Sequence, residues 1–390
     1  MDPPAYQLPD GIRGRTVPIR DLDMHILETG DSSSPLLLLL HGFPELSVSW
    51  RKVMLPLAAL GYRVVAPDQR GYGRTTPRTG YTRPISYEDD LQPFTMISLV
   101  TDIVALAYAL GYRTVASVVG HDFGSGVAGY CALIRPDVFK SVVLMSAPFT
   151  GPPSLPFDVD NPHSPATEQL TSLAQMVDVA LAALQPPRKH YTAYFSGPDA
   201  NADMVHAPQG LSAFLGAYFH MKSADWPEND PHPLGAPNIA NLATMPHYYI
   251  MPLEATMADV VQRGAPSKDE AERNSWLPDA ELALFTAQFG HTGFQGGLNW
   301  YRCMRDAQLS RGLTVFAGKR IEVPAMYLSG KKDWGVYQTP GAAEKMRYDV
   351  CAQMEEEDFV LVEGAGHWVQ QEQPEQVIAH LARFLNKVKQ

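Results

Sequence analysis

The chain has 390 residues, 45% of them hydrophobic and 10% aromatic, and it carries a formal net charge of −11 at pH 7. A chain of this length and composition can bury a large core and hold an inserted second domain, which excludes a protein dominated by disorder. The negative charge, with no cluster of lysine and arginine, argues against a nucleic-acid or anionic-membrane partner.

Cysteine usage and the N-terminus bear on location. The three cysteines have no metal-type spacing, so neither a disulfide framework nor a zinc site is expected, and a reducing, cytoplasmic setting is predicted. The N-terminal residues lack the basic start and apolar core of a signal peptide, and the longest leucine run covers only residues 36–40, so no membrane span is expected. Neither a metal nor another cofactor is predicted.

The first part of the chain alternates between strand and helix patterns. We expect an edge hairpin formed by strands at 16–20 and 24–29, and two buried strands at 35–40 and 62–66. Two helices are expected at 49–60 and 96–110. The run at 35–40 is apolar throughout, which is typical of a strand buried on both faces. Strand alternating with helix predicts an α/β fold, with a mostly parallel sheet covered by helices on both faces.

Residues 114–132 predict a buried strand, a tight turn and a helix, with Asp122 on the turn. Asp122 lies between Gly120 and Gly124, which is the spacing of a nucleophile elbow. In such an elbow the strand and the next helix come so close that a side chain at either glycine would clash. The usual elbow carries serine, and the plainer interpretation of this motif alone is a loop aspartate that caps a helix. A further strand is expected at 141–145.

The alternation stops there, and the next strand pattern, at 325–329, comes about 170 residues later, far more than one strand-to-helix connection needs. We therefore expect a mainly helical cap domain at 151–310, inserted between the two parts of a sheet domain, 1–150 and 311–390. Helices are predicted at 167–184, 203–222 with a break at Pro208, 279–289 and 298–308. Residues 226–264, rich in Met, Tyr and His, receive no assignment and suit either the core of the cap or an apolar pocket.

Two polar residues beyond the insert follow strand patterns. Asp333 comes after the strand at 325–329, and His367 comes after a second strand that ends at residue 362. Asp122, Asp333 and His367 therefore occur in the chain order of nucleophile, acid and histidine that hydrolases with an elbow use. The loop at 41–44 (HGFP) falls where such a fold supplies one backbone N–H of an oxyanion hole.

With these residues in place, the chain resembles the epoxide hydrolases of the α/β-hydrolase fold from about Gly14 to its C-terminus. The resemblance rests on five motifs, which are HGFP at 41–44, GHDFG at 120–124, NWYR at 299–302, KD at 332–333 and GHW at 366–368. It implies an α/β-hydrolase fold with an inserted helical cap. It also implies that Asp122 is the nucleophile, Asp333 the orienting acid and His367 the base.

The same resemblance assigns roles to further residues. Tyr301 and Tyr191 would be two cap tyrosines, with Tyr194 as an alternative to Tyr191. The N–H groups of Phe43 and Phe123 would form the oxyanion hole. The substrate pocket would be lined by aromatic and loop residues, namely His41, Pro44, Trp300, Trp334 and Trp368. The chain departs from the family at Phe123, where tryptophan is common, and in a longer segment between the two tyrosines.

The chemistry of an aspartate in the elbow points the same way. A carboxylate with an ordinary pKa near ~3.9 is already ionised at neutral pH and needs no base to attack. Attack on an acyl carbon would give a reactive anhydride, whereas attack on a saturated carbon gives a stable ester, so C–O or C–halogen bonds are the predicted targets. His367, paired with Asp333, would then activate water to hydrolyse the ester. An epoxide oxygen departs as an alkoxide and needs an acid, which a tyrosine can be.

Three functions stay open. Epoxide hydrolase is favoured, with an apolar small-molecule epoxide and water as reactants. A haloalkane dehalogenase or another Asp-nucleophile hydrolase would need Trp226 or Trp300 to donate to the halide. A non-catalytic ligand-binding member of the fold would be favoured by a substituted triad, but all three residues are present. The sequence leaves open which epoxide is used and whether the chain forms a homodimer.

Overall fold

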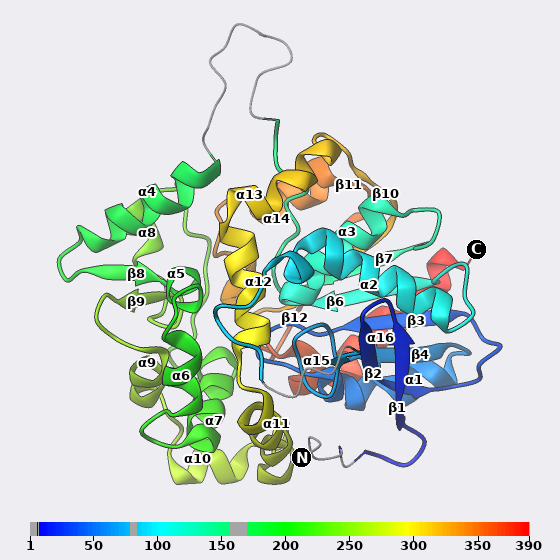
Figure 1. The fold of residues 1–390 in the computed structure, drawn as a ribbon, viewed down its shortest axis with the longest axis horizontal. Coiled ribbons are helices and arrows are strands. Elements are labelled where there is room, and N and C mark those ends of the chain that lie inside the picture. Colours follow the sequence, from blue (N-terminus) through cyan, green and yellow to red (C-terminus); the bar gives the residue numbers. More distant parts are fainter. Residues whose placement is uncertain (1–5, 7, 79–83, 156–169, 390) are drawn as a thin grey trace, which may run out of the picture.

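The computed structural model describes residues 6, 8–78, 84–155 and 170–389. The main sheet consists of β1 (Arg13–Ile19), β2 (Leu22–Thr29), β3 (Leu36–Leu40), β4 (Arg63–Pro67), β5 (Thr76–Pro77), β6 (Ser117–His121), β7 (Val142–Met145), β10 (Ile321–Gly330), β11 (Cys351–Gln353) and β12 (Phe359–Val362). The strand order is β1-β2-β4-β3-β6-β7-β10-β11, with β12 beside β10 and β5 beside β2 (Figure 1). Strand β2 pairs antiparallel with β1, β4 and β5, and the other pairs are parallel.

The central strands form where the sequence is apolar on both faces. Strands β3, β4, β6 and β7 are buried along their whole length, as expected of parallel strands that are covered on both sides. Helices cover them in two packed pairs, α1 (Arg51–Ala59) with α16 (Pro374–Val388) and α2 (Met96–Ala109) with α3 (Phe123–Ile134). The predicted α/β fold with a mostly parallel sheet and an edge hairpin is therefore confirmed.

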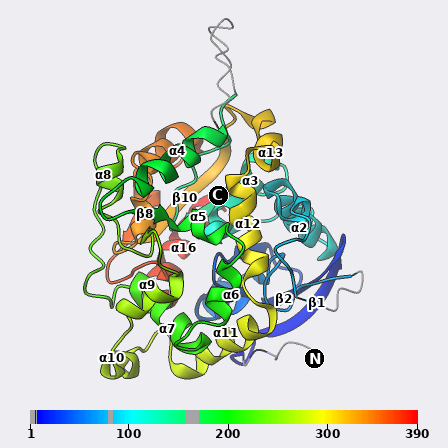
Figure 2. The same ribbon diagram turned by 60° about the vertical axis from the view of Figure 1, so that its left-hand side comes forward.

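A helical insertion separates β7 from β10, and Figures 1 and 2 show most of it to one side of the sheet. Its helices are α4 (Leu170–Ala182), α5 (Tyr191–Phe195), α6 (Ala200–Val205), α7 (Leu211–Lys222), α8 (Ile239–Leu242), α9 (Met257–Arg263), α10 (Lys268–Arg273), α11 (Asp279–Thr292), α12 (Gln295–Arg305) and α13 (Ala307–Ser310). The break at Pro208 is confirmed, because α6 ends before it and α7 begins after it. The limits of the cap at 151 and 310 stay predictions.

The insertion also holds a small sheet that the sequence did not predict. Strand β8 (Arg188–His190) pairs antiparallel with β9 (Ile250–Pro252). Strands of three residues are too short to show an alternating pattern, which is why both were missed, as was β11. The unassigned stretch 226–264 contains α8, β9 and α9. Helix α9 begins at a capping box in which Thr256 and Asp259 bond each other's backbone N–H.

Some predicted elements have different bounds. The strand expected at 114–119 is β6, which begins only at Ser117, because the preceding backbone forms just an isolated bridge between Val115 and Phe139. The helix expected at 298–308 stops at Arg305. Asp306 is extended there, and its carboxylate accepts bonds from the first N–H groups of α13. The helix expected at 167–184 is α4, which ends at Ala182, and residues 167–169 of that prediction lie outside the described residues.

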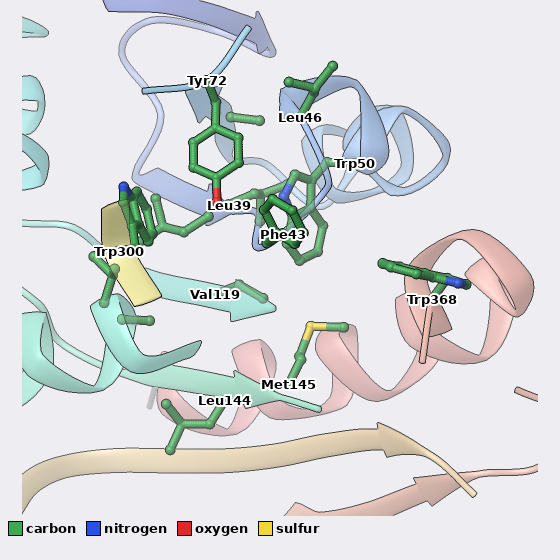
Figure 3. Packing of buried hydrophobic residues seen from close by; sticks show 14 of the residues in the cluster. Leu39, Phe43, Leu46, Trp50, Tyr72, Val119, Leu144, Met145, Trp300 and Trp368 are labelled. Carbon is green, nitrogen blue, oxygen red and sulfur yellow. The ribbon is translucent and has the colours of Figure 1, made fainter. Parts of the chain in front are cut away.

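The hydrophobic core continues from the sheet into the insertion. Figure 3 shows Leu39 and Val119 on neighbouring strands, with Tyr72 and Trp300 of α12 close by. The Trp300 ring packs edge-on against Tyr72 with 5.3 Å between ring centroids, and its Nε1 donates to the carbonyl of Arg70 at 3.1 Å. Among the helices of the described chain, none is long and apolar enough to cross a lipid bilayer.

Candidate active site

Asp122 lies on a strained turn between β6 and α3. Its φ of 53° and ψ of −122° fall in a region that side chains other than glycine rarely adopt. The two flanking glycines permit the turn. A Cβ at Gly120 would come within 2.1 Å of the Gly124 carbonyl, and one at Gly124 within 2.3 Å of the Leu40 carbonyl. The close approach of strand and helix is the geometry of a nucleophile elbow.

The fold brings Asp122, Asp333 and His367 together. His367 Nε2 lies 3.3 Å from Oδ2 of Asp122, and Nδ1 lies 3.1 Å from Oδ1 of Asp333. Ser146 Oγ is also 3.0 Å from Nδ1 of His367. Asp333 accepts a bond from the Gly335 N–H at 2.7 Å, which fixes its carboxylate. The imidazole thus faces one carboxylate on each side, the arrangement that orients a histidine base.

Burial and charge set the ionisation of these groups. Burial alone would raise the pKa of the Asp122 carboxyl, but the adjacent His367 and the charge of Lys222 outweigh it and hold that pKa well below its usual range. Asp333 behaves in the same way, because His367 outweighs the effect of burial on its pKa. Both carboxyls are therefore ionised at neutral pH, and Asp122 is ready to attack without a base.

The oxyanion-hole prediction concerns Phe43 and Phe123. The Phe43 N–H donates to Oδ1 of Asp122 at 2.9 Å, so it already faces the carboxylate. Phe123 is the first residue of α3, directly after Asp122. Its N–H stays a prediction as the second donor. Its ring packs edge-on against Tyr301 and Trp300, with 5.2 Å between ring centroids in each pair.

A cavity of about 390 Å³ opens beside Asp122. Tyr191 and Tyr301 both line it, and their ring centroids lie 6.0 Å apart. Burial, followed by the charge of Asp122, raises the pKa of both phenols well above the ordinary value. Both tyrosines therefore stay protonated at neutral pH and can donate. Tyr194 is placed elsewhere, because its hydroxyl donates to Asp203 Oδ2 at 3.0 Å and it does not line this cavity.

Of the five predicted pocket residues, Trp300 lines this cavity and four do not. His41 is buried, with Nδ1 2.9 Å from the Gly42 carbonyl and Nε2 accepting from the Gln69 N–H, so it supports the loop rather than the pocket. Pro44 is buried in that loop.

The other two are tryptophans next to the predicted acid and base. Trp368 is buried, and its Nε1 donates to the Phe219 carbonyl at 2.8 Å, which ties the His367 loop to α7. Trp334 lines a second cavity, together with residues of the stretch that the sequence left unassigned. Neither ring lines the cavity beside Asp122. Trp368 packs against Phe219 and Trp334 packs against His232, and both of these partners belong to the insertion.

Sequence reasoning missed a buried glutamate under the site. Glu45 Oε2 lies 2.6 Å from Nδ1 of His121, and Oε1 accepts bonds from the side-chain amides of Gln370 and Gln371 at 2.9 Å each. His121 Nε2 lies 2.7 Å from the carbonyl of His367. Burial lowers the pKa of His121, but Glu45 outweighs it and the net pKa is raised. In the sequence, Glu45 was signalled only by its partner His121, a histidine inside the elbow motif.

Lys222, at the end of α7, was also missed. Its ammonium lies 5.5, 5.4 and 5.3 Å from the ring centroids of Tyr218, Tyr249 and Trp368, distances at which cations are attracted to aromatic faces. Its carbonyl accepts the His367 N–H at 2.8 Å. Tyr218 lies one helical turn before Lys222, but Tyr249 and Trp368 are distant in the chain, so no sequence motif marks this lysine and only the fold reveals it.

Comparison with known proteins places this geometry in context. The family profile described as alpha/beta hydrolase fold matches residues 35–188. Over 384 residues the chain is 31% identical to Epoxide hydrolase 3 of Siraitia grosvenorii, covering 97% of this chain and 99% of that one. It is 30% identical to Epoxide hydrolase A of Mycobacterium tuberculosis, covering 95% and 96%.

Solved structures give the same result. An epoxide hydrolase from an endophytic Streptomyces superposes with a TM-score of 0.74 at 27% identity, covering 98% of this chain and 97% of that chain. Potato epoxide hydrolase I superposes with a TM-score of 0.69 at 30% identity, covering 96% and 99%. The likeness extends through the insertion as well as the sheet, because nearly the whole of each chain is covered.

Proposed function

This chain belongs to the epoxide hydrolases of the α/β-hydrolase fold, and we propose that it opens an epoxide to a vicinal diol through a covalent ester on Asp122. The proposal rests on the groups that surround the Asp122 carboxylate. Asp122 has His367 at 3.3 Å, a backbone N–H at 2.9 Å, and two protonated tyrosines lining the same apolar cavity. Together these groups supply the nucleophile, the base and the acids that this reaction requires.

In the first step, an oxygen of Asp122 attacks a ring carbon of the epoxide. A C–O bond of the ring breaks as the ester bond forms, and the departing oxygen takes a proton from Tyr301 or Tyr191. The tyrosinate left behind regains a proton through water after hydrolysis, when Asp122, returned as a carboxylic acid, ionises again. The raised pKa of both phenols, caused first by burial, keeps them protonated before the reaction. An alkoxide is a poor leaving group without such an acid.

In the second step, His367 takes a proton from a water molecule, and the resulting hydroxide attacks the carbonyl carbon of the ester. The Phe43 N–H, already directed at Oδ1 of Asp122, stabilises the oxyanion, and the Phe123 N–H is the proposed second donor. Collapse of the intermediate releases the diol, whose oxygen receives the proton from His367. Asp333 keeps the imidazole oriented through Nδ1 throughout.

The dehalogenase alternative lacks the donors it requires. Phe123 has no ring N–H, and the Nε1 of Trp300 already donates to the Arg70 carbonyl at 3.1 Å. Trp226 lines the second cavity and not the one beside Asp122. A non-catalytic role would leave unexplained why His367, oriented by Asp333, lies against the strained residue Asp122.

A trapped intermediate tests the proposal. His367→Gln should leave attack by Asp122 intact but stop hydrolysis, because the water loses its base. Intact-mass measurement after mixing this variant with an apolar epoxide should show protein plus one substrate, and Asp122→Ala should show none. An unmodified His367→Gln variant with undiminished turnover would refute the mechanism.

A further inference from the structure

The cavity beside Asp122 continues as an apolar arm along α3. From this helix, Phe123, Gly126 and Tyr130 line it, and their spacing of three and then four residues places them on one helix face. With a rise of 1.5 Å per residue, the arm follows α3 for about 12 Å beyond Asp122. The cavity is therefore much longer than an oxirane ring requires.

Gly126 leaves the space that makes this arm continuous. A Cβ added at Gly126 would meet only the terminal methyl of Met96, at 3.7 Å, which is an ordinary contact. The other glycines on α3 differ, because a Cβ at Gly124 would lie 2.3 Å from the Leu40 carbonyl and one at Gly129 would lie 2.7 Å from the Phe149 ring. Glycine weakens a helix relative to alanine. At position 126 close packing does not require a glycine, so the effect of Gly126 is to leave open volume in the cavity.

The walls of the arm show which chemical group it fits. Aromatic and aliphatic side chains from α2, α12, the loop after β7 and the 3-10 helix Arg311–Phe316 surround it, including Leu99, Phe149 and Leu313. Among the described residues, the charged side chains that line the cavity are Asp122 and Arg305. The Arg305 guanidinium is held by Asp178 and by Thr192 Oγ1, so it is not free to bind an anionic group. The arm is therefore suited to an uncharged, apolar chain.

We propose that Gly126 sets the substrate length, so that the site prefers uncharged epoxides carrying a long unbranched alkyl substituent that lies along α3 from Asp122 towards Tyr130. This inference rests on the proposed function and adds the substrate class to it. Phe123 lines the start of the arm, next to Asp122.

A series of terminal epoxides, from epoxybutane to epoxydodecane, tests the inference. In the parent, kcat/KM should rise by about fourfold for each methylene group buried, until the arm is full. In Gly126→Leu, the rise of kcat/KM with chain length should stop after the first members of the series. For epoxydodecane the loss should reach about 10²-fold, corresponding to three or four methylene groups excluded.

Three further variants keep the result independent of folding. Met96→Phe narrows the arm from the opposite wall and should depress only the long epoxides. The double variant Gly126→Leu/Met96→Ala returns space next to the new side chain and should restore activity on epoxydodecane. Gly126→Ala adds one methyl group and should stay close to the parent, with a melting midpoint that is no lower.

The outcomes separate this inference from the function on which it rests. If the parent releases no diol from any member of the series, the proposed function fails. If the parent is active but Gly126→Leu and Met96→Phe keep the parental dependence on chain length, or lose activity equally on epoxybutane and epoxydodecane, Gly126 does not set the length and the inference is overturned.

Discussion

The sheet and the insertion position their reacting groups in different ways. In the sheet, Asp122 follows β6, Asp333 follows β10 and His367 follows β12, so each lies just beyond the C-terminal end of a parallel strand. In the insertion, Tyr191 begins the short helix α5, and Tyr301 lies in the middle of α12. The C-terminal ends of parallel strands lie along one edge of the sheet, so the residues that follow those strands are brought together. Helices offer no comparable rule. The difference predicts that the two regions serve separable steps.

Removing the tyrosine hydroxyls should have the largest effect and should fall on ring opening alone. Tyr301→Phe and Tyr191→Phe should each slow formation of the alkyl-enzyme by about 10²-fold, the usual size of losing one acid-base partner, and the double variant should nearly abolish it. Rapid quenching followed by intact-mass measurement reports this step directly. The melting midpoints should stay at the parental value, because neither hydroxyl hydrogen-bonds another of the described residues.

Tyr194→Phe is the matched control for that comparison. Tyr194 is three residues from Tyr191, but its hydroxyl donates to Asp203 at 3.0 Å, so its loss should leave ring opening unchanged. The cost should appear instead as about 1 kcal/mol of stability. Parental ring-opening rates in both Tyr301→Phe and Tyr191→Phe would show that the insertion supplies no acid, and the division of labour between the two regions would be wrong.

The same contrast explains how far the sequence could go. Asp122, Asp333 and His367 could be predicted because strands have short apolar runs and the residue after each run is confined to one edge. The two tyrosines came only from resemblance to a family. Tyr191 and Tyr194 are the first and fourth residues of the short helix α5, and their separate destinations depend on contacts with α6 and α12 that no local pattern encodes.

The misplaced tryptophans follow from the same limit. Trp334 and Trp368 are adjacent in the chain to Asp333 and His367, yet both rings turn into the interface with the insertion. On an irregular loop, the direction of a side chain depends on the local backbone conformation, which a sequence pattern does not give. Glu45 and Lys222 were missed for a related reason, since most of their partners, such as Gln370 for Glu45 and Trp368 for Lys222, come from segments that are remote in sequence.

Glu372 joins the two regions and should have a smaller effect on the second step. Its carboxylate accepts N–H bonds from Ala224 in the insertion at 2.8 Å and, on either side of His367, from Gly366 and Trp368 at 2.9 Å each. Glu372→Gln replaces one acceptor oxygen by a donor, so it should cost about 2 kcal/mol of stability. Hydrolysis of the ester should slow by about tenfold, while alkylation stays at the parental rate, because His367 acts only in hydrolysis.

Glu375→Gln is the control for that prediction, because Glu375 is exposed and only three residues away. It should change neither step nor the melting midpoint. If Glu372→Gln slowed alkylation and hydrolysis equally, Glu372 would support the whole site and not the position of the base.

The smallest expected effect is a flat pH profile for ring opening. Attack needs an ionised Asp122, whose folded pKa is held below its usual range because His367 and Lys222 outweigh burial, so the active form is lost only as the pH falls through that lowered value. Proton donation needs protonated tyrosines, whose pKa burial raises well above the ordinary value, so that form is lost only at still higher pH. Between about pH 5 and pH 9, one unit inside the ordinary pKa values of aspartate and tyrosine, neither group titrates.

The pre-steady-state rate of alkyl-enzyme formation by the parent, measured by rapid quench across that window, should therefore change by less than about twofold. A rate that climbs tenfold with pH would show that the core carboxylate is protonated near neutrality, and one that falls tenfold would show that the insertion's phenols are not.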